Sequence, residues 1–204
     1  MNSQKTISEI IELQGIGLHN GVKVNMRLMP AEVNHGIQFI RTDIDSTKNV
    51  IEANYKNVRS PILCTRIENS YGVSVSTIEH LMAVFYGEGI DNVLVEIDAP
   101  EVPIMDGSSF DFVTAIKSFG VKKQNSPKKF IKVLKKVSVK DGDKYISIEP
   151  YKNDLVIDFE IIYKNPLIRT RKKQFRLSKD DITPIYNSKT FCLYEDIDKI
   201  KSQG

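Results

Sequence analysis

The stretch Ser76–Tyr86 constrains the fold of this chain more than any other. Its apolar residues recur at i, i+3, i+4 and i+7, which is the spacing of one helical face: Ile78, Leu81, Met82 and Phe85. Gly87 and Gly89 follow as helix stop signals. We therefore expect an amphipathic helix here, with an acid and an imidazole side by side near its start.

The adjacent residues Glu79 and His80 each allow two interpretations. Ser76 precedes Glu79 by three residues, which is the spacing of a capping box in which both side chains satisfy backbone N–H groups. Alternatively, Glu79 is a catalytic carboxylate and His80 a metal ligand; a single histidine in a first turn can equally be a satisfied polar group. Val84 stands where a zincin motif has its second histidine, so any metal held by His80 needs distant ligands.

Strand signals surround this helix and predict an α+β fold with an antiparallel or mixed sheet. Gly15-x-Gly17 resembles a dinucleotide fingerprint only superficially, because the Asn20-Gly21 turn leads into a strand and predicts a hairpin. A second helix should run from about Ser109 to Phe119, after a turn at Asp106. The strands that we expect in the first half are 7–13, 22–28, 37–40, 62–67 and 93–97.

A charged, proline-containing stretch divides the chain. We place a linker at 123–127, between a first domain at 1–122 and a second at 128–204. Strand patterns then recur at 130–134, 137–139, 146–148 and 155–163, with short helices expected from Ser178 and near Glu195. The basic run at 169–176 has few aromatic neighbours, which favours a solvated strand or loop and gives no support to nucleic-acid binding.

Length and composition indicate a soluble globular protein. The 204 residues are 41% hydrophobic, enough for packed cores, but no apolar run approaches the roughly 18 residues of a membrane span. The N-terminus lacks a signal-peptide pattern, so we expect a cytoplasmic protein without a transmembrane segment. Cys64 and Cys192 form no CxxC pair, and the net charge of +3 suits an anionic substrate no better than an ordinary surface.

Seven motifs in register over nearly the whole chain identify a family resemblance. They are GIGLH at 15–19, RTD at 41–43, LCT at 63–65, STIEHL at 76–81, GIDN at 89–92, PIMDGS at 103–108 and KTF at 189–191. Together they resemble the UDP-3-O-acyl-N-acetylglucosamine deacetylases, zinc amidases that catalyse the committed step of lipid A biosynthesis in Gram-negative bacteria. The resemblance implies two layered sheet-plus-helix domains and hydrolysis of an N-acetyl group, released as acetate, from UDP-3-O-(3-hydroxyacyl)-N-acetylglucosamine. We expect a monomer.

The resemblance also implies residue roles. It makes Glu79 the general base, His80 a Zn²⁺ ligand and Thr190 a hydrogen-bond donor to the oxyanion. It places six residues near the substrate: His19, Leu63, Cys64, Lys144, Phe191 and Asp196. The plainer alternatives are a turn role for His19, ordinary strand positions for Leu63 and Cys64, and a β-strand role for Thr190.

One departure from the family pattern affects the activity expected of this chain. Members of the family continue beyond the position of Gly204 into a His-x-x-x-Asp pair of zinc ligands and a later histidine that acts as general acid. The only histidines here are His19, His35 and His80, so the zinc site and the second domain are both expected to be incomplete. The alternatives are therefore a truncated, inactive remnant, or a module that binds the UDP-sugar or its acyl chain without hydrolysis.

Overall fold

The computed structural model describes residues 3–59, 63–152, 154–193 and 197. The chain divides into two compact units, one formed by Met1–Lys128 with Pro184–Gly204 and the other by Lys129–Thr183. No helix among the described residues is long and apolar enough to cross a membrane. The fold is α+β, as the sequence predicts, because the two long helices and the strands of the main sheet in the first unit each have an apolar side to bury.

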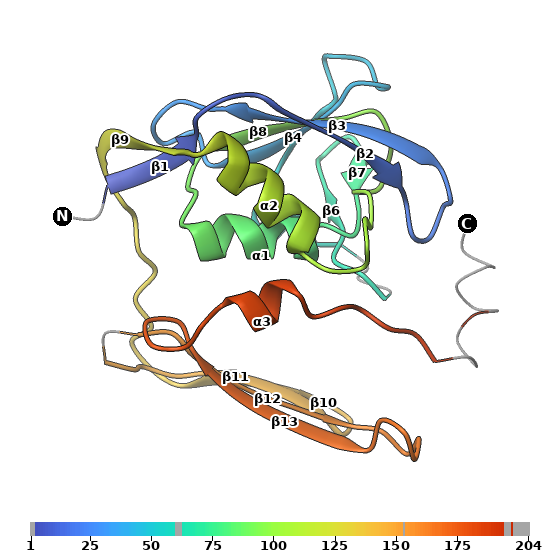
Figure 1. Cartoon of the computed structure of the whole chain (residues 1–204), viewed down its shortest axis with the longest axis vertical. Coiled ribbons are helices and arrows are strands. Elements are labelled where there is room, and N and C mark those ends of the chain that lie inside the picture. Colours follow the sequence, from blue (N-terminus) through green and yellow to red (C-terminus); the bar gives the residue numbers. More distant parts are fainter. Residues whose placement is uncertain (1–2, 60–62, 153, 194–196, 198–204) are drawn as a thin grey trace. The chain divides into compact units, whose positions relative to one another are not determined.

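A five-stranded mixed sheet is the frame of the first unit (Figure 1). In spatial order its strands are β2 (Ile11–Ile16), β3 (Lys23–Pro30), β8 (Val93–Ile97), β4 (Ile37–Arg41) and β5 (Val50–Glu52). Strands β4 and β8 are parallel and the other pairs are antiparallel. The hairpin expected from Asn20-Gly21 is confirmed, since β2 and β3 pair from Ile11↔Leu28 to Ile16↔Lys23.

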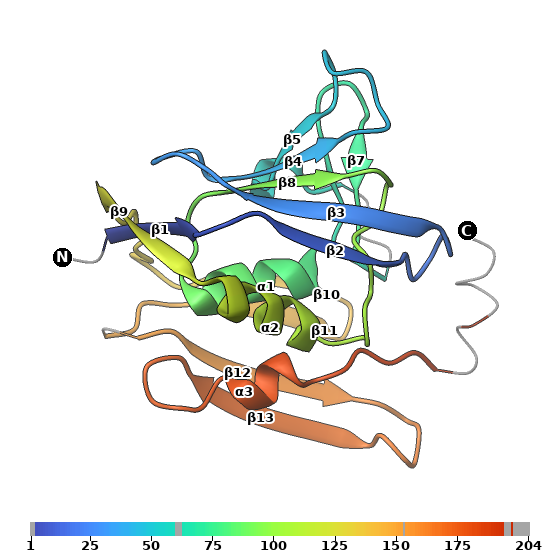
Figure 2. The same cartoon turned by 45° about the horizontal axis from the view of Figure 1, so that its top comes forward.

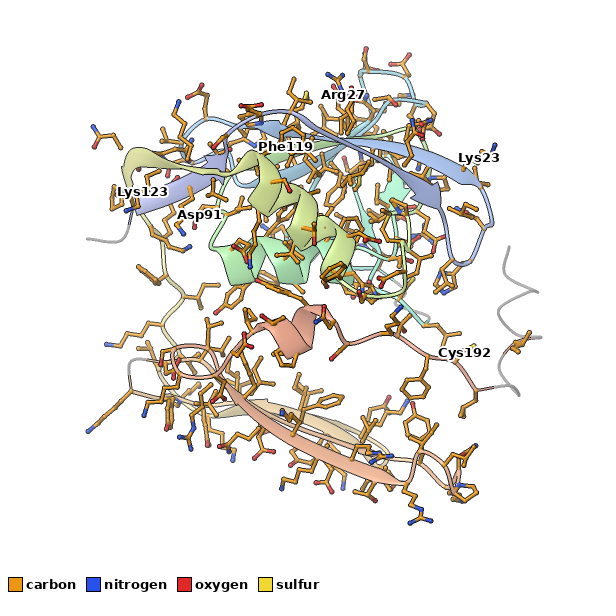
Figure 3. All side chains as sticks on the ribbon, viewed as in Figure 1. Lys23, Arg27, Asp91, Phe119, Lys123 and Cys192 are labelled. Carbon is orange, nitrogen blue, oxygen red and sulfur yellow. The ribbon has the colours of Figure 1, made fainter. Side chains whose placement is uncertain are left out.

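Side-chain alternation explains why β3 forms. Val24, Met26 and Leu28 are buried, whereas the residues between them are exposed. Arg27 points to the face opposite the helices (Figure 3), and its Nη1 donates to Glu96 Oε2 at 3.0 Å. The strand therefore separates a buried face from a charged, solvated one, as its sequence predicts.

Helices α1 (Glu79–Glu88) and α2 (Phe110–Phe119) lie side by side on the buried face of this sheet (Figures 1 and 2). The side chains that they bury are Leu81, Val84, Phe85, Phe112, Val113 and Ile116. Helix α1 ends at Gly89, whose φ of 71° permits the left-handed cap. Both helices predicted for this half of the chain are therefore confirmed, although Gly87 lies inside α1 rather than ending it.

Two short pairings complete the strands of the first unit. Strand β1 (Ser3–Ile7) pairs with β9 (Val121–Pro127), and β6 (Ile67–Glu68) pairs with β7 (Ser74–Val75). A 3₁₀ turn covers Tyr55–Asn57.

Two expected strands of the first half differ in the structure. The single strand expected over 7–13 is divided between β1 and β2, because the chain leaves one sheet and joins another between them. The strand expected over 62–67 is wrong for 63–66: Leu63 has a φ of 58°, which lies outside the β region.

The expected linker at 123–127 is part of strand β9, where the alternating exposure of polar residues allows pairing with β1. The residues from Pro184 onwards group with the first unit. The division into domains at 1–122 and 128–204 therefore stays a prediction, with these two segments placed differently by the contacts.

The second unit contains two antiparallel hairpins. They consist of β10 (Val137–Asp141) with β11 (Lys144–Ile148), and β12 (Val156–Ile162) with β13 (Thr170–Arg176). The basic run is the exposed strand β13, as expected. No strand forms over 130–134, and the short helix α3 spans Thr183–Tyr186 instead of beginning at Ser178. The helix expected near Glu195 falls largely outside the described residues.

Candidate active site

Glu79 is the first residue of α1, and its carboxylate is held by a loop rather than by its own helix. The Thr65 backbone N–H donates to Glu79 Oε2 at 3.0 Å, and the structure describes no hydrogen bond to Oε1. The predicted capping box is wrong, because the helix begins three residues after Ser76, whose hydroxyl donates to the Pro100 carbonyl instead. The Glu79 carboxylate is therefore free of a capping role and offers one oxygen to a ligand.

His80 is half-buried beside Glu79 on the first turn of α1. The Ser109 hydroxyl, at the start of α2, donates to the His80 carbonyl oxygen at 2.9 Å and thereby ties the two helix starts together. Within the described part of the chain, the His80 imidazole itself takes part in no hydrogen bond or ion pair. Its ring nitrogens are thus available to a metal ion or to substrate.

A buried glutamate, Glu101, joins the loop that carries His19 to the segment before α1. Glu101 is 1% exposed, and its Oε1 lies 2.7 Å from His19 Nδ1 and 2.8 Å from the Thr77 hydroxyl. The backbone N–H groups of His19 and Asn20 also donate to this carboxylate, at 3.1 and 3.2 Å. His19 is therefore more than a turn residue, because a buried acid fixes both its backbone and its ring.

Cys64 lies in the same cluster. Burial, together with the charges of Glu79 and Glu101, raises the pKa of the Cys64 thiol, and hydrogen bonds from Thr77 only partly oppose this. The thiol is therefore protonated at neutral pH, so Cys64 lines the cluster as an uncharged side chain and not as a nucleophile. The neighbouring Leu63 exposes 59% of its surface, so an apolar side chain is presented to solvent beside this cluster.

Backbone strain is concentrated around these residues. Five described non-glycine residues have positive φ, and three of them flank the cluster: Leu63 at 58°, Thr77 at 56° and Met105 at 54°. A β-branched residue such as Thr77 is a genuine outlier there, at a cost of about 1–3 kcal/mol. Strain of this kind persists where the surrounding structure holds the residue for function.

Thr190 is positioned by the loop that precedes α2. Its backbone N–H donates to the Gly107 carbonyl at 2.8 Å, and Lys189 Nζ lies 3.1 Å from Asp106 Oδ2. Asp106 also accepts hydrogen bonds from the Ser108 N–H and hydroxyl, in the turn role expected of it. Because the same loop continues to Ser109 and so to His80, one short segment contacts both Thr190 and the start of α1.

The structure does not test three other predicted site residues. Lys144 is exposed on β11 of the second unit, and Phe191 is 52% exposed next to Thr190. Asp196 lies outside the described residues. The roles of these residues stay predictions.

The described residues do not by themselves fit a complete catalytic zinc site. Such a site normally has three protein ligands and a water molecule. Over the described ranges, no group of three or more His, Cys, Asp and Glu side chains could hold a metal ion. His80 is suited to supply one ligand.

A family model described as UDP-3-O-acyl N-acetylglycosamine deacetylase matches residues 4–204. The chain belongs to this family. It is 42% identical to the UDP-3-O-acyl-N-acetylglucosamine deacetylase of Actinobacillus succinogenes, an alignment that covers 100% of this chain and 67% of the relative.

Two further relatives of the same name align with similar shares of this chain and of their own length. The deacetylase of Shewanella violacea is 40% identical over 98% of this chain and 66% of its own length. That of Aliivibrio fischeri is 42% identical over 100% and 67%. The chain thus spans about two thirds of the length of the family members that it matches, and the family name describes a hydrolase.

Sequence reasoning missed Glu101 as a site residue. It sits in the run Ala99-Pro100-Glu101-Val102-Pro103, which is typical of a strand end. The signal that could have identified Glu101 is the apolar character of its neighbours. Ala99 and Val102 are each 1% exposed, and an acid between two buried residues requires hydrogen-bond partners. Nothing in the sequence identified His19 as that partner, 82 residues away.

Proposed function

We propose that this chain carries the general base and one metal ligand of a zinc-dependent deacetylase acting on UDP-3-O-(3-hydroxyacyl)-N-acetylglucosamine. The observation that carries the proposal is the arrangement at the start of α1. Glu79 is anchored through Oε2 by the Thr65 N–H, and among the described residues neither its Oε1 nor the adjacent His80 ring has a hydrogen-bond partner. Anchoring one oxygen of a carboxylate leaves the other aimed and ready to accept a proton.

Amide hydrolysis defines what these residues have to do. Water must lose a proton as it attacks the carbonyl carbon, and the tetrahedral oxygen must be stabilised. Glu79 Oε1 is the atom that would take the proton from water. The half-buried setting of Glu79 excludes part of the bulk solvent, which strengthens interactions of that carboxylate with a bound substrate.

Thr190 is the proposed donor to the tetrahedral oxygen. Thr190 is an exposed residue, while its backbone is fixed by the Gly107 carbonyl and the neighbouring Lys189–Asp106 ion pair. A neutral donor held in this way needs no reorganisation during the reaction. This role follows from the family resemblance, and the contacts of the 106–109 loop support it.

We infer that the ligands that would join His80 come from the part of the relatives' length that this alignment does not cover. The family resemblance places a His-x-x-x-Asp pair there. Among the described residues, His80 is the one that suits the role of a zinc ligand, and bound zinc would supply a polarised water molecule for attack on the amide. The same proposal assigns the activity to the cytoplasm of a Gram-negative bacterium, with a nucleotide-linked lipid precursor as the small-molecule partner and a monomeric enzyme.

Zinc binding and turnover test the proposal in two proteins. The 204-residue chain alone should bind far less than one zinc and show no release of acetate. A chimaera that joins it to the last third of the Actinobacillus succinogenes relative should bind one zinc and deacetylate the substrate. Without turnover by a folded, zinc-loaded chimaera the proposal fails, and saturable UDP-sugar binding without hydrolysis would identify a binding module instead.

Glu79→Gln in the chimaera tests the base. It should lower kcat on the order of a hundredfold or more while zinc stoichiometry is unchanged, because general-base catalysis contributes about 10²–10⁴-fold. The matched control is Glu96→Gln, the same chemical change on β8, where the side chain contacts Arg27 rather than the cluster. Full activity of the Glu79→Gln chimaera would refute the assignment.

A further inference from the structure

Glu101 is the most completely hydrogen-bonded side chain of the candidate site. Its Oε2 accepts from the His19 and Asn20 backbone N–H groups, and its Oε1 from the Thr77 hydroxyl and the His19 N–H, with His19 Nδ1 at 2.7 Å. Burial of a carboxylate to 1% exposure is costly without such partners. The backbone is equally constrained, because Ser76 N–H donates to the Pro100 carbonyl and Val102 N–H donates to the Ser76 carbonyl.

These contacts decide which nitrogen of His19 carries the proton. A carboxylate is an acceptor only, so the atom at 2.7 Å from Oε1 must be a donor. Neutral His19 is therefore the Nδ1–H tautomer, with a lone pair on Nε2. That side of the ring is the one turned away from Glu101, and the His19 side chain is 14% exposed.

The same carboxylate reaches the start of α1. Thr77 donates its hydroxyl to Oε1 while its backbone has a φ of 56°, and only Ile78 separates it from Glu79 and His80. A hydrogen bond to a buried charged group is worth about 1.5–3 kcal/mol, comparable to the strain of that backbone. Glu101 thus offsets the strain that places the base and the imidazole.

We propose that Glu101 is a positioning residue for the deacetylase site: it holds His19 in the Nδ1–H tautomer, so that Nε2 presents a lone pair to substrate or water, and it holds Thr77 in the strained conformation that orients Glu79 and His80. The tautomer of His19 is a property of this chain alone. The consequence for catalysis rests on the proposed function.

Glu101→Gln makes a directional prediction. The backbone N–H groups of His19 and Asn20 both face Oε2, and that of His19 also lies 3.1 Å from Oε1. Because these groups can only donate, glutamine satisfies both of them with its amide oxygen in the place of Oε2 and its NH₂ in the place of Oε1. The NH₂ then donates to His19 Nδ1, and the ring has to carry its proton on Nε2. Thr77 can rotate its hydroxyl to accept. The substitution should therefore invert the tautomer of His19 with little change of shape.

Long-range ¹H–¹⁵N spectra of the chain labelled with ¹⁵N-histidine measure this directly, at a pH where the rings are neutral. The sequence has only three histidines, and His35, whose Nδ1 lies 3.1 Å from the Gly36 carbonyl, is an internal control outside the cluster. We expect Nδ1–H at His19 in the unmodified chain and Nε2–H in Glu101→Gln, with His35 unchanged in both. An Nε2–H tautomer in the unmodified chain overturns the proposal even where the variant fails to fold.

Activity of the chimaera tests the catalytic consequence separately. Glu101→Gln should lower kcat/KM by about tenfold or more, as loss of a residue that orients an imidazole does, while zinc stoichiometry is retained. Glu96→Gln should leave it unchanged. An active chimaera in which Glu101→Gln is neutral refutes the positioning role, whereas a chimaera without any activity refutes the proposed function and leaves the tautomer result standing.

Discussion

Gly17→Ala should destabilise the first unit by pushing its new methyl group into the Asn20 side chain and the Glu101 carboxylate. A Cβ at Gly17 would clash with Asn20 Oδ1 and would lie 2.6 Å from Glu101 Oε2, and this distance is 0.8 Å closer than the 3.4 Å at which ordinary contact begins. Gly17 is not among the glycines with positive φ, so the backbone itself accepts alanine. The close approach of the Asn20 side chain and of the buried Glu101 carboxylate is therefore the physical reason for glycine at this position.

The expected loss of stability follows from the hydrogen bonds that the Glu101 carboxylate accepts. The carboxylate would have to move by most of 0.8 Å, which would stretch bonds that Oε2 accepts at 3.1 and 3.2 Å beyond hydrogen-bonding distance. Losing one hydrogen bond to a buried charge costs about 1.5–3 kcal/mol, and overpacking costs about 1–3 kcal/mol. We expect the free energy of unfolding of the first unit to fall by about 3 kcal/mol.

Urea denaturation followed by circular dichroism at helical wavelengths measures this loss. The chain has no tryptophan, and its two ten-residue helices, α1 and α2, both belong to the first unit, so the helical signal reports on that unit. For a urea dependence of about 2 kcal/mol/M, the midpoint should fall by about 1.5 M.

Gly15→Ala is the matched control. Its Cβ would lie 2.7 Å from Pro103 Cβ, so it should also lower the midpoint, but it does not meet the carboxylate directly. Only Gly17→Ala should change the ¹⁵N spectrum of His19. A midpoint unchanged by Gly17→Ala would refute the close approach, and an equal effect of both variants on His19 would refute its link to Glu101.

Three further predictions concern other parts of the chain. The hydrogen bond from Arg41 lowers the pKa of Asp43 below 3.8, so Asp43→Asn should cost about 1 kcal/mol at neutral pH, and this difference in urea midpoint should shrink as the pH falls below 3.8. Burial and the neighbouring Glu88 raise the pKa of Tyr186 above 10. The stability that the protonated phenol contributes is therefore present below pH 10 and lost above it, and Tyr186→Phe should reduce that alkaline loss of stability in urea titrations. Ile131 is 94% exposed among other exposed apolar residues of the second unit, so the chain should bind the dye ANS and Ile131→Ser should weaken the fluorescence without changing the helical urea transition.

Hydrophobic patterns in the sequence predicted the main strands and helices of the first unit, because the period of each pattern matches the spacing of the side chains that the element buries. The alternation of β3 and the helical spacing of α1 each describe one apolar face, and the sheet buries both. The structure differs from local patterns where pairing partners decide. The residues at 123–127 look like a polar linker, yet they are a strand because β1 lies beside them. Leu63 lies outside the β region because its loop turns to bring the Thr65 N–H to Glu79.

For the site, the sequence by itself determined the covalent neighbours: an acid and an imidazole adjacent in one helical turn, together with motifs that place the chain in its family. Only the tertiary structure decided that Glu79 is bound by Thr65 rather than by Ser76, and that Glu101 binds His19 across 82 residues. The physical reason is that a buried carboxylate takes whichever donors the packed chain brings to it. Those donors are mostly backbone N–H groups, which every residue except proline carries, so no residue pattern could reveal them.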